Sequence, residues 1–160
     1  MEKNKYILFV FFCILFGVLG YYREFFFGHY NNTMYYLFHG NTTVPVHPQF
    51  QAFLNIPYKT VYYLKYIFTL LSFLLFFGLS FWCLKVFTNN KNLLKWFTYS
   101  YLVLLLLSSV LMLWSYFVKG KLDSDEYSVS RWLMGIAQSP LPVLFFLATA
   151  KLNEELRIKN

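Results

Sequence analysis

Few side chains in this chain could do more than pack, and several of them follow the first long apolar run. The segment YYREFFFGHYNN, at residues 21–32, combines charged, titratable and aromatic side chains. With the basic residues that open later apolar runs, the candidates are Arg23, Glu24, His29, Lys65 and Arg131. At one common depth, their cationic groups could bind a lipid phosphate, a carboxylate or an acidic loop of a partner protein. They could equally be anchors at a membrane boundary.

Catalytic and metal chemistry find little support in the residue pattern. Glu24 and His29 are the nearest acid–base pair, and the sequence supplies no nucleophile beside them. The histidines His29, His39 and His47 lack a local HxxxH or cysteine-pair pattern. The two cysteines lie in apolar runs and form no CxxC motif. We therefore expect no metal, no cofactor, and no disulfide across the loop that holds the histidines.

Four uncharged runs must position these side chains, at residues 6–22, 66–84, 96–118 and 132–150. The chain is 58% hydrophobic and 13% charged, whereas soluble domains average about 25% charged residues. A helix of roughly 20 apolar residues crosses a bilayer, and nothing in the sequence alternates as barrel strands do. The sequence therefore predicts an all-α integral membrane protein, one domain over residues 1–160 with four transmembrane helices.

The ends of these runs predict an orientation. The segment MEKNK and the first run resemble a signal peptide, but the small-x-small cleavage site is missing, so we expect an uncleaved helix. Residues 1–5, 85–95 and 151–160 hold eight Lys and Arg in 26 positions, against six in 56 for residues 23–65 and 119–131. The bias predicts that both termini face the cytoplasm. The net charge of +7 is an orientation signal, and we expect no nucleic-acid partner.

Residues 23–65 form the long outer loop in this topology, and they are too aromatic for a disordered linker. Tyrosine and tryptophan favour the headgroup region, so we expect one or two short interfacial helices there. The turn-rich segment GNTTVPVHP would connect them. Two Asn-x-Thr triplets, which begin at Asn31 and Asn41, would be glycan acceptors in a eukaryotic secretory protein.

The fourth apolar run contains two prolines in the segment QSPLP. Proline removes a backbone donor and clashes with the preceding turn, so the run is predicted to kink or break there. The residues concerned are Gln138, Ser139, Pro140 and Pro142. A broken helix can build a midplane binding site in a transporter, or it can be a kink whose freed carbonyls are met by neighbours. The lack of charges within the apolar runs argues against a transporter.

Several features together carry a family resemblance: a first helix that runs into YYREFFF, a long aromatic loop, YKTVYYLKYIFT and SRWLMGIAQSPLPVLFFLATA. In these features the chain resembles the small four-helix membrane proteins associated with exosortase systems in Bacteroidetes. That family has an aromatic–Arg–aromatic–Glu stretch and a basic residue opening the second helix. Here Glu24 follows Arg23 directly, and Lys65 stands where an arginine is expected.

The resemblance implies an accessory role in protein sorting or envelope assembly. It does not imply the sorting enzyme, which needs a thiolate cysteine beside arginines on the outer side. Cys13 and Cys83 lie in apolar runs, where no cation lowers a thiol pKa.

The leading functional hypothesis is a non-enzymatic inner-membrane accessory subunit that docks another integral membrane protein. Small residues in the spans would allow close helix packing: Gly17, Gly20, Gly78, Ser80, Ser108 and Ser109. One alternative is an enzyme of lipid or isoprenoid chemistry at the outer leaflet, with Arg23, Glu24, His29 and Arg131 around a headgroup. Another is a glycosylated eukaryotic four-span protein. Membrane lipids are expected partners in each case.

Overall fold

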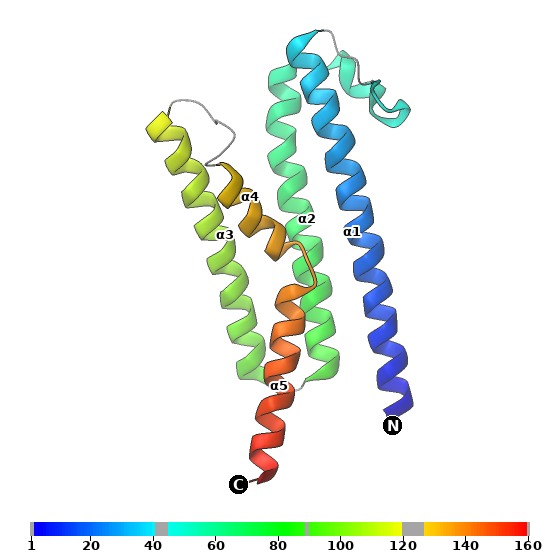
Figure 1. Ribbon diagram of the computed structural model, residues 1–160, viewed down its shortest axis with the longest axis vertical. Coiled ribbons are helices and arrows are strands. Elements are labelled where there is room, and N and C mark those ends of the chain that lie inside the picture. The colour runs from blue at the N-terminus through cyan, green and yellow to red at the C-terminus, as the bar shows by residue number, and fades with distance from the viewer. Residues whose placement is uncertain (1, 41–44, 89, 120–126, 160) are drawn as a thin grey trace. The chain divides into compact units, whose positions relative to one another are not determined.

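The protein is helical throughout the described part of the chain. The computed structural model describes residues 2–40, 45–88, 90–119 and 127–159 (Figure 1). The elements are α1 (Glu2–His39), the 3-10 helix η1 (Pro48–Asn55), α2 (Tyr58–Phe87), α3 (Lys91–Lys119), α4 (Tyr127–Ala137) and α5 (Leu141–Lys159). No strand occurs within these described ranges. Three of the helices are long and apolar enough to span a membrane, and the bent pair α4 and α5 is a fourth candidate.

α1 is much longer than the apolar run that begins it. It has 38 residues and continues through residues 23–39, where the sequence predicted short interfacial helices within a loop. No proline interrupts this stretch. The helix ends at Gly40, whose φ of 67° is in the left-handed region that favours glycine. The Gly40 N–H donates to the Tyr36 carbonyl at 2.9 Å, a common way to close a helix.

Local capping sets the other helix ends. Pro48 begins η1, where its missing N–H costs nothing, and the His47 side chain accepts from the Gln49 N–H. The Asn90 Oδ1 accepts from the N–H groups of Asn92 and Leu93, at 3.0 and 3.2 Å, at the start of α3. An asparagine at this position satisfies donors that have no partner inside the helix.

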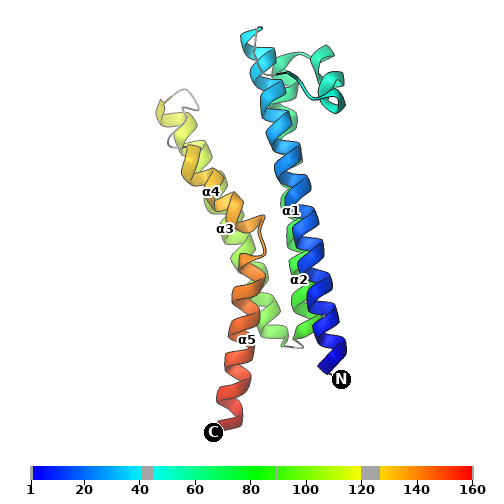
Figure 2. The ribbon, with the colours of Figure 1, turned by 45° about the vertical axis from the view of Figure 1, so that its right-hand side comes forward.

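The fourth apolar run is broken between α4 and α5. α4 ends at Ala137 and α5 begins at Leu141, and the two helices meet at an angle of 54° (Figure 2). Pro140 lies in the gap and Pro142 follows in the first turn of α5. A proline in the first turn of a helix is tolerated, whereas one in the interior breaks the hydrogen-bond ladder.

The chain divides into two compact units. The bundle unit comprises Met1–Phe16 and Phe73–Asn160, and the aromatic unit comprises Gly17–Ser72. In the bundle unit, α1 contacts α2 through Phe12 and Trp82, whose ring centroids are 5.1 Å apart. α3 packs against α4 and α5, and α4 also contacts α5.

Buried polar contacts join the helices of the bundle unit. The Tyr101 hydroxyl of α3 donates to Ser80 Oγ of α2 at 3.1 Å. The Ser130 hydroxyl of α4 donates to the Ser108 carbonyl of α3 at 2.8 Å, and the two hydroxyl oxygens lie 2.9 Å apart. Such serine pairs let helix backbones approach closely in an apolar surrounding. Of the small residues that the sequence suggested for close packing, Ser80 and Ser108 are thus used inside the chain.

Candidate functional site

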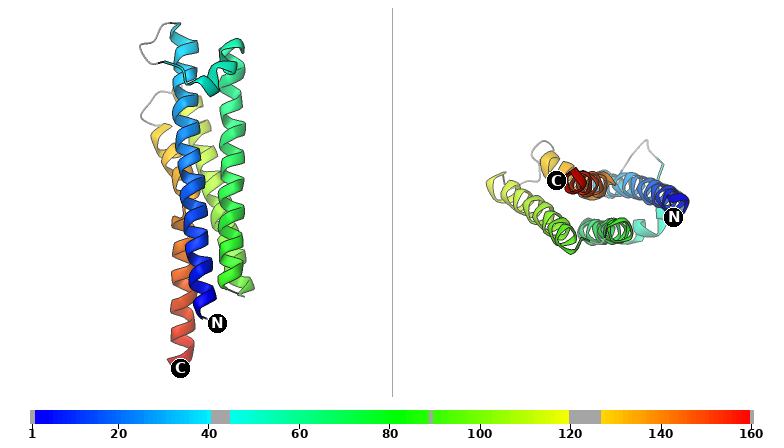
Figure 3. Two further views of the ribbon diagram at one scale, coloured as in Figure 1. Left: turned by 90° about the vertical axis from the view of Figure 1, so that its right-hand side faces the viewer. Right: turned by 90° about the horizontal axis from the view of Figure 1, so that it is seen from below.

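The aromatic unit has a core of its own, which explains the crowd of aromatics in residues 21–40. Tyr30 of α1, Phe50 of η1 and Val61 of α2 are buried, and Tyr30 and Val61 have no exposed surface. The Tyr30 hydroxyl donates to the Val61 carbonyl at 2.6 Å. Partly buried side chains pack around them: Phe25, Phe26, Met34, Leu37, Val46, Phe53, Ile56, Leu64 and Phe68. One core therefore ties together three elements. The backbones of α1, η1 and α2 can be followed in Figure 3.

The aromatic rings of this core contact one another in defined geometries. Phe26 meets Phe68 edge-on, with ring centroids 4.9 Å apart, and stacks on Tyr30 at 5.4 Å. Tyr30 also forms an edge-to-face contact with Phe53 at 5.3 Å. Edge-to-face and offset arrangements are the favoured geometries for aromatic pairs, because the ring edge is positive and the face negative. The core is thus specifically packed.

Arg23 and Glu24 form an ion pair on α1, just before the first residues of this core. Arg23 Nη1 lies 3.0 Å from Glu24 Oε1, and 24% of the arginine side chain is exposed, against 75% of the glutamate. The Arg23 Nε atom is buried and has no hydrogen-bond partner in the described part of the chain. The guanidinium is therefore only partly satisfied by the protein.

His29 pairs with a histidine that the sequence did not link to it. The rings of His29 and His47 have centroids 4.5 Å apart, and Phe25 forms an edge-to-face contact with each, at 4.6 and 5.3 Å. His47 Nδ1 accepts the Gln49 N–H at 3.4 Å. Within the described ranges, no group of three or more His, Cys, Asp and Glu side chains could hold a metal ion. The pair joins η1 to α1.

The remaining predicted residues belong to different parts of the chain. Lys65 is on α2 in the aromatic unit, where its side chain is partly buried and its carbonyl accepts from Thr69 Oγ1 at 2.8 Å. Arg131 is exposed on α4 in the bundle unit, next to the buried Ser130. Four of the five predicted site residues therefore lie in the aromatic unit.

The break between α4 and α5 is satisfied locally. The Ser139 hydroxyl donates to the Ile136 carbonyl at 2.7 Å, and its oxygen accepts the Leu141 N–H at 3.3 Å. The Gln138 N–H donates to the Met134 carbonyl at 2.9 Å, and Gln138 is buried. The Ile136 carbonyl, which Pro140 leaves without a backbone donor, thus finds a partner at the break itself.

One face of α1 is exposed and carries unusually small side chains. Cys13, Gly17, Gly20 and Gly28 recur on this face, together with the larger Glu24, at three- or four-residue intervals, and all five except the partly buried Gly20 are exposed. A Cβ atom added at any of these three glycines would meet no atom within 4 Å. No packing among the residues that the structure describes requires their small size.

Three residues central to the aromatic unit were not predicted as such: Tyr30, His47 and Phe50. A signal for Tyr30 was present, because Phe26, Tyr30, Met34 and Leu37 recur at three- and four-residue intervals, as one face of a helix does. Nothing in the local sequence links His47 or Phe50 to that face.

Comparison with protein-family models, with curated proteins and with solved structures found no match to this chain. Its function is therefore inferred from its own residues and their arrangement.

Proposed function

We propose that the protein is a non-enzymatic accessory subunit of a bacterial inner membrane. It has four spans, with α4 and α5 together forming the fourth, and both termini in the cytoplasm. It docks another integral membrane protein, in exosortase-type protein sorting or envelope assembly. Two features support the membrane placement, and one face of α1 carries the docking role.

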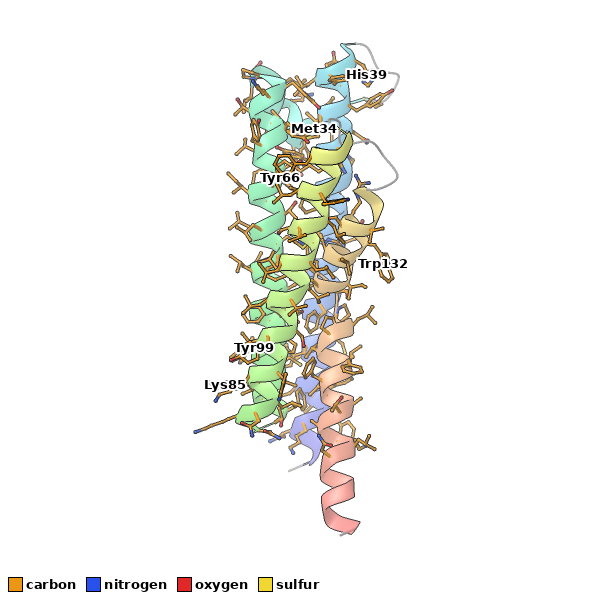
Figure 4. The ribbon with its side chains drawn as sticks, turned by 90° about the vertical axis from the view of Figure 1, so that its left-hand side faces the viewer. Met34, His39, Tyr66, Lys85, Tyr99 and Trp132 are labelled. Atoms are coloured by element: carbon orange, nitrogen blue, oxygen red, sulfur yellow. The ribbon has the colours of Figure 1, made fainter. Side chains whose placement is uncertain are left out.

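The tryptophans of α3 support insertion in a bilayer. Trp96 and Trp114 are both 67% exposed and are separated by 18 residues, or about 27 Å at the rise of an α-helix. Exposed Leu and Val side chains fill the interval, among them Leu102, Val103, Leu106, Leu107 and Val110. The spacing matches a hydrocarbon layer of about 30 Å with a tryptophan at each boundary. Trp132 also points away from its helix (Figure 4).

The exposed side chains of α1 change character at Tyr21 and Tyr22. Before them, exposed positions are mostly apolar, as at Ile14 and Val18. After them the exposed face carries polar and small residues, among them Glu24, Gly28, Asn31 and Asn32. This change favours a boundary near Tyr22, beyond which about 25 Å of α1 would project on the outer side. The aromatic core would then be that of a small head outside the lipid, in place of helices lying on the leaflet.

The glycine face of α1 is the observation that carries the docking proposal. A glycine inside a helix costs about 0.5–1 kcal/mol relative to alanine. Gly17, Gly20 and Gly28 have no neighbour in the described chain that a Cβ atom would displace. A requirement for small residues there is explained by the close approach of a helix from another protein.

Replacing Gly17 with leucine is expected to abolish recovery of the partner while the protein still enters the membrane. The leucine fills the contact face, yet it raises helix propensity and remains compatible with lipid. The protein is purified from native membranes in mild detergent, and its stoichiometric membrane partner is identified by mass spectrometry. Val18→Leu, on a neighbouring exposed face, is the matched control. If Gly17→Leu retains the partner as well as Val18→Leu does, the glycine face is not the docking site.

The proposed orientation predicts opposite labelling of two engineered cysteines. In a background with Cys13 and Cys83 replaced by alanine, Asn32→Cys should react with a membrane-impermeant maleimide in intact spheroplasts. Asn92→Cys should react only after the membrane is permeabilised. Both positions are exposed, Asn32 on α1 and Asn92 at the start of α3. The reverse pattern would place the termini outside the cytoplasm and refute the orientation.

The alternative of a glycosylated eukaryotic protein is not supported by the structure around its first Asn-x-Thr triplet, residues 31–33. Thr33 is fully buried and its hydroxyl donates to the His29 carbonyl at 2.9 Å. The hydroxyl of the Asn31 triplet is thus engaged in the folded helix. The second triplet, Asn41-Thr42-Thr43, lies outside the described residues.

A further inference from the structure

Arg23 differs from an arginine that simply extends its charge into water. Only 24% of its side chain is exposed, whereas the neighbouring Glu24 is 75% exposed. Arg23 continues the spacing of the packed face of α1, three residues before Phe26 and seven before Tyr30. Arg23 therefore lies near the packed face of α1, and most of its side chain is shielded from solvent.

The described part of the protein supplies no hydrogen-bond acceptor to the Nε atom of the Arg23 guanidinium. Arginine presents its donors in a fork that matches two oxygens of a phosphate or carboxylate. Glu24 accepts from Nη1. Nε belongs to the edge on the other side of the fork, and it has no acceptor among the residues described. A buried donor without a partner is unfavourable, so an acceptor from outside the chain would stabilise this arrangement.

The depth of Arg23 selects the acceptor. It directly follows Tyr21 and Tyr22, which are 67% and 64% exposed, at the position where the exposed face of α1 changes from apolar to polar. Tyrosines favour the headgroup region of a bilayer. In that region phosphodiester groups are the most abundant anions, and cationic side chains reach toward them.

We propose that Arg23 binds the phosphate of a phospholipid headgroup in the outer leaflet. The phosphate approaches the exposed part of the Arg23 side chain. Because Nε is enclosed in the described conformation, the guanidinium turns outward to present Nε and Nη2 to the phosphate oxygens. Glu24 competes for the same cation from its solvent side. This inference rests on the membrane insertion proposed above.

Native mass spectrometry of the detergent-purified protein, titrated with phosphatidylglycerol or with an uncharged glycolipid of the same acyl chains, tests the proposal. Wild type should prefer phosphatidylglycerol. Arg23→Gln should bind it about tenfold more weakly, the effect expected on losing a charge-assisted hydrogen bond. Arg23→Lys keeps the charge without the fork and should fall between the two. Glu24→Gln should bind more tightly than wild type, because the competing carboxylate is gone.

Two controls separate the possible failures. Lys59→Gln removes an exposed cation of α2 and should leave binding unchanged. Alkaline carbonate extraction verifies that each variant remains in the membrane; loss of wild type from the pellet would overturn membrane insertion itself. Equal affinity of wild type and Arg23→Gln for phosphatidylglycerol in inserted protein would overturn the Arg23 site alone. Displacement of the lipid by millimolar inorganic phosphate would overturn the lipid assignment in favour of free phosphate.

Discussion

Replacing Tyr30 with alanine is expected to destabilise the aromatic unit by about 4 kcal/mol, the usual cost of removing a fully buried aromatic side chain. Tyr30 has no exposed surface and contacts residues from all three elements of the unit: Phe26 of α1, Phe53 of η1, and Val61 and Phe68 of α2. Its loss leaves a cavity that the neighbouring rings fill only in part. η1 and the first turns of α2 should then open far more often.

Hydrogen exchange, followed by mass spectrometry, measures this opening in the amides of residues 26–37 and 48–64. The Tyr30→Ala protein should lose protection there and keep it in α3, which belongs to the bundle unit. Tyr30→Phe removes only the hydroxyl that donates to Val61 and should cost about 1 kcal/mol. Tyr35→Ala, at a position that is 57% exposed, is the matched control. Equal protection in Tyr30→Ala and Tyr35→Ala would mean that Tyr30 does not hold the unit together.

Placing an arginine at Leu106 is expected to oppose membrane insertion by about 3 kcal/mol, which corresponds to roughly a hundredfold change in the inserted fraction. Leu106 is 64% exposed and lies near the middle of the interval between Trp96 and Trp114. If α3 spans the bilayer, an arginine there must sit in hydrocarbon, ten residues from Trp96 and eight from Trp114. A long side chain at this depth reaches water only by thinning the bilayer.

The fraction of the protein that resists alkaline carbonate extraction, normalised to total synthesis, measures this effect. Asn92→Arg introduces the same charge at an exposed position in the first turn of α3 and should insert as wild type does. Undiminished insertion of Leu106→Arg would show that this face of α3 is not exposed to lipid. The membrane topology proposed here would then be wrong for α3.

Much of the helical architecture follows from local sequence. The apolar runs at residues 66–84 and 96–118 lie inside α2 and α3. Residues 6–22 lie inside α1. Hydropathy reports the part of a helix suited to lipid and says little about where a helix stops, because capping and proline decide that. This is why the predicted runs are shorter than the helices that contain them.

The extension of α1 through residues 23–39 could not be read from hydropathy. Charged and polar residues at Arg23, Glu24, His29, Asn31 and Asn32 interrupt the apolar run, so this stretch was expected to leave the first helix. Most helical stability in proteins comes from tertiary packing of one face. Here that face packs against η1 and the start of α2, which are neighbours only after the chain has turned back.

The candidate site, like the fold, was predictable from the sequence only in part. Arg23 and Glu24 are adjacent in the sequence, so their side chains can form an ion pair without any tertiary contact. Both were predicted as site residues from the sequence. The contact between His29 and His47 joins residues 18 positions apart, and the buried Nε of Arg23 depends on what packs around it. Burial is a property of neighbours distant in sequence.

What the sequence by itself determined is the set of apolar runs, their flanking cations and the prolines, because backbone hydrogen bonding and transfer to lipid act on contiguous residues. Only the tertiary structure decided that the aromatics after Tyr22 form a core and that η1 closes on α1 through His47. It also decided that, in the described part of the chain, a Cβ atom added at three glycines of α1 would meet no other atom. These features depend on the faces that helices turn toward one another. A helix with apolar residues on every side does not reveal its packing face from its own sequence.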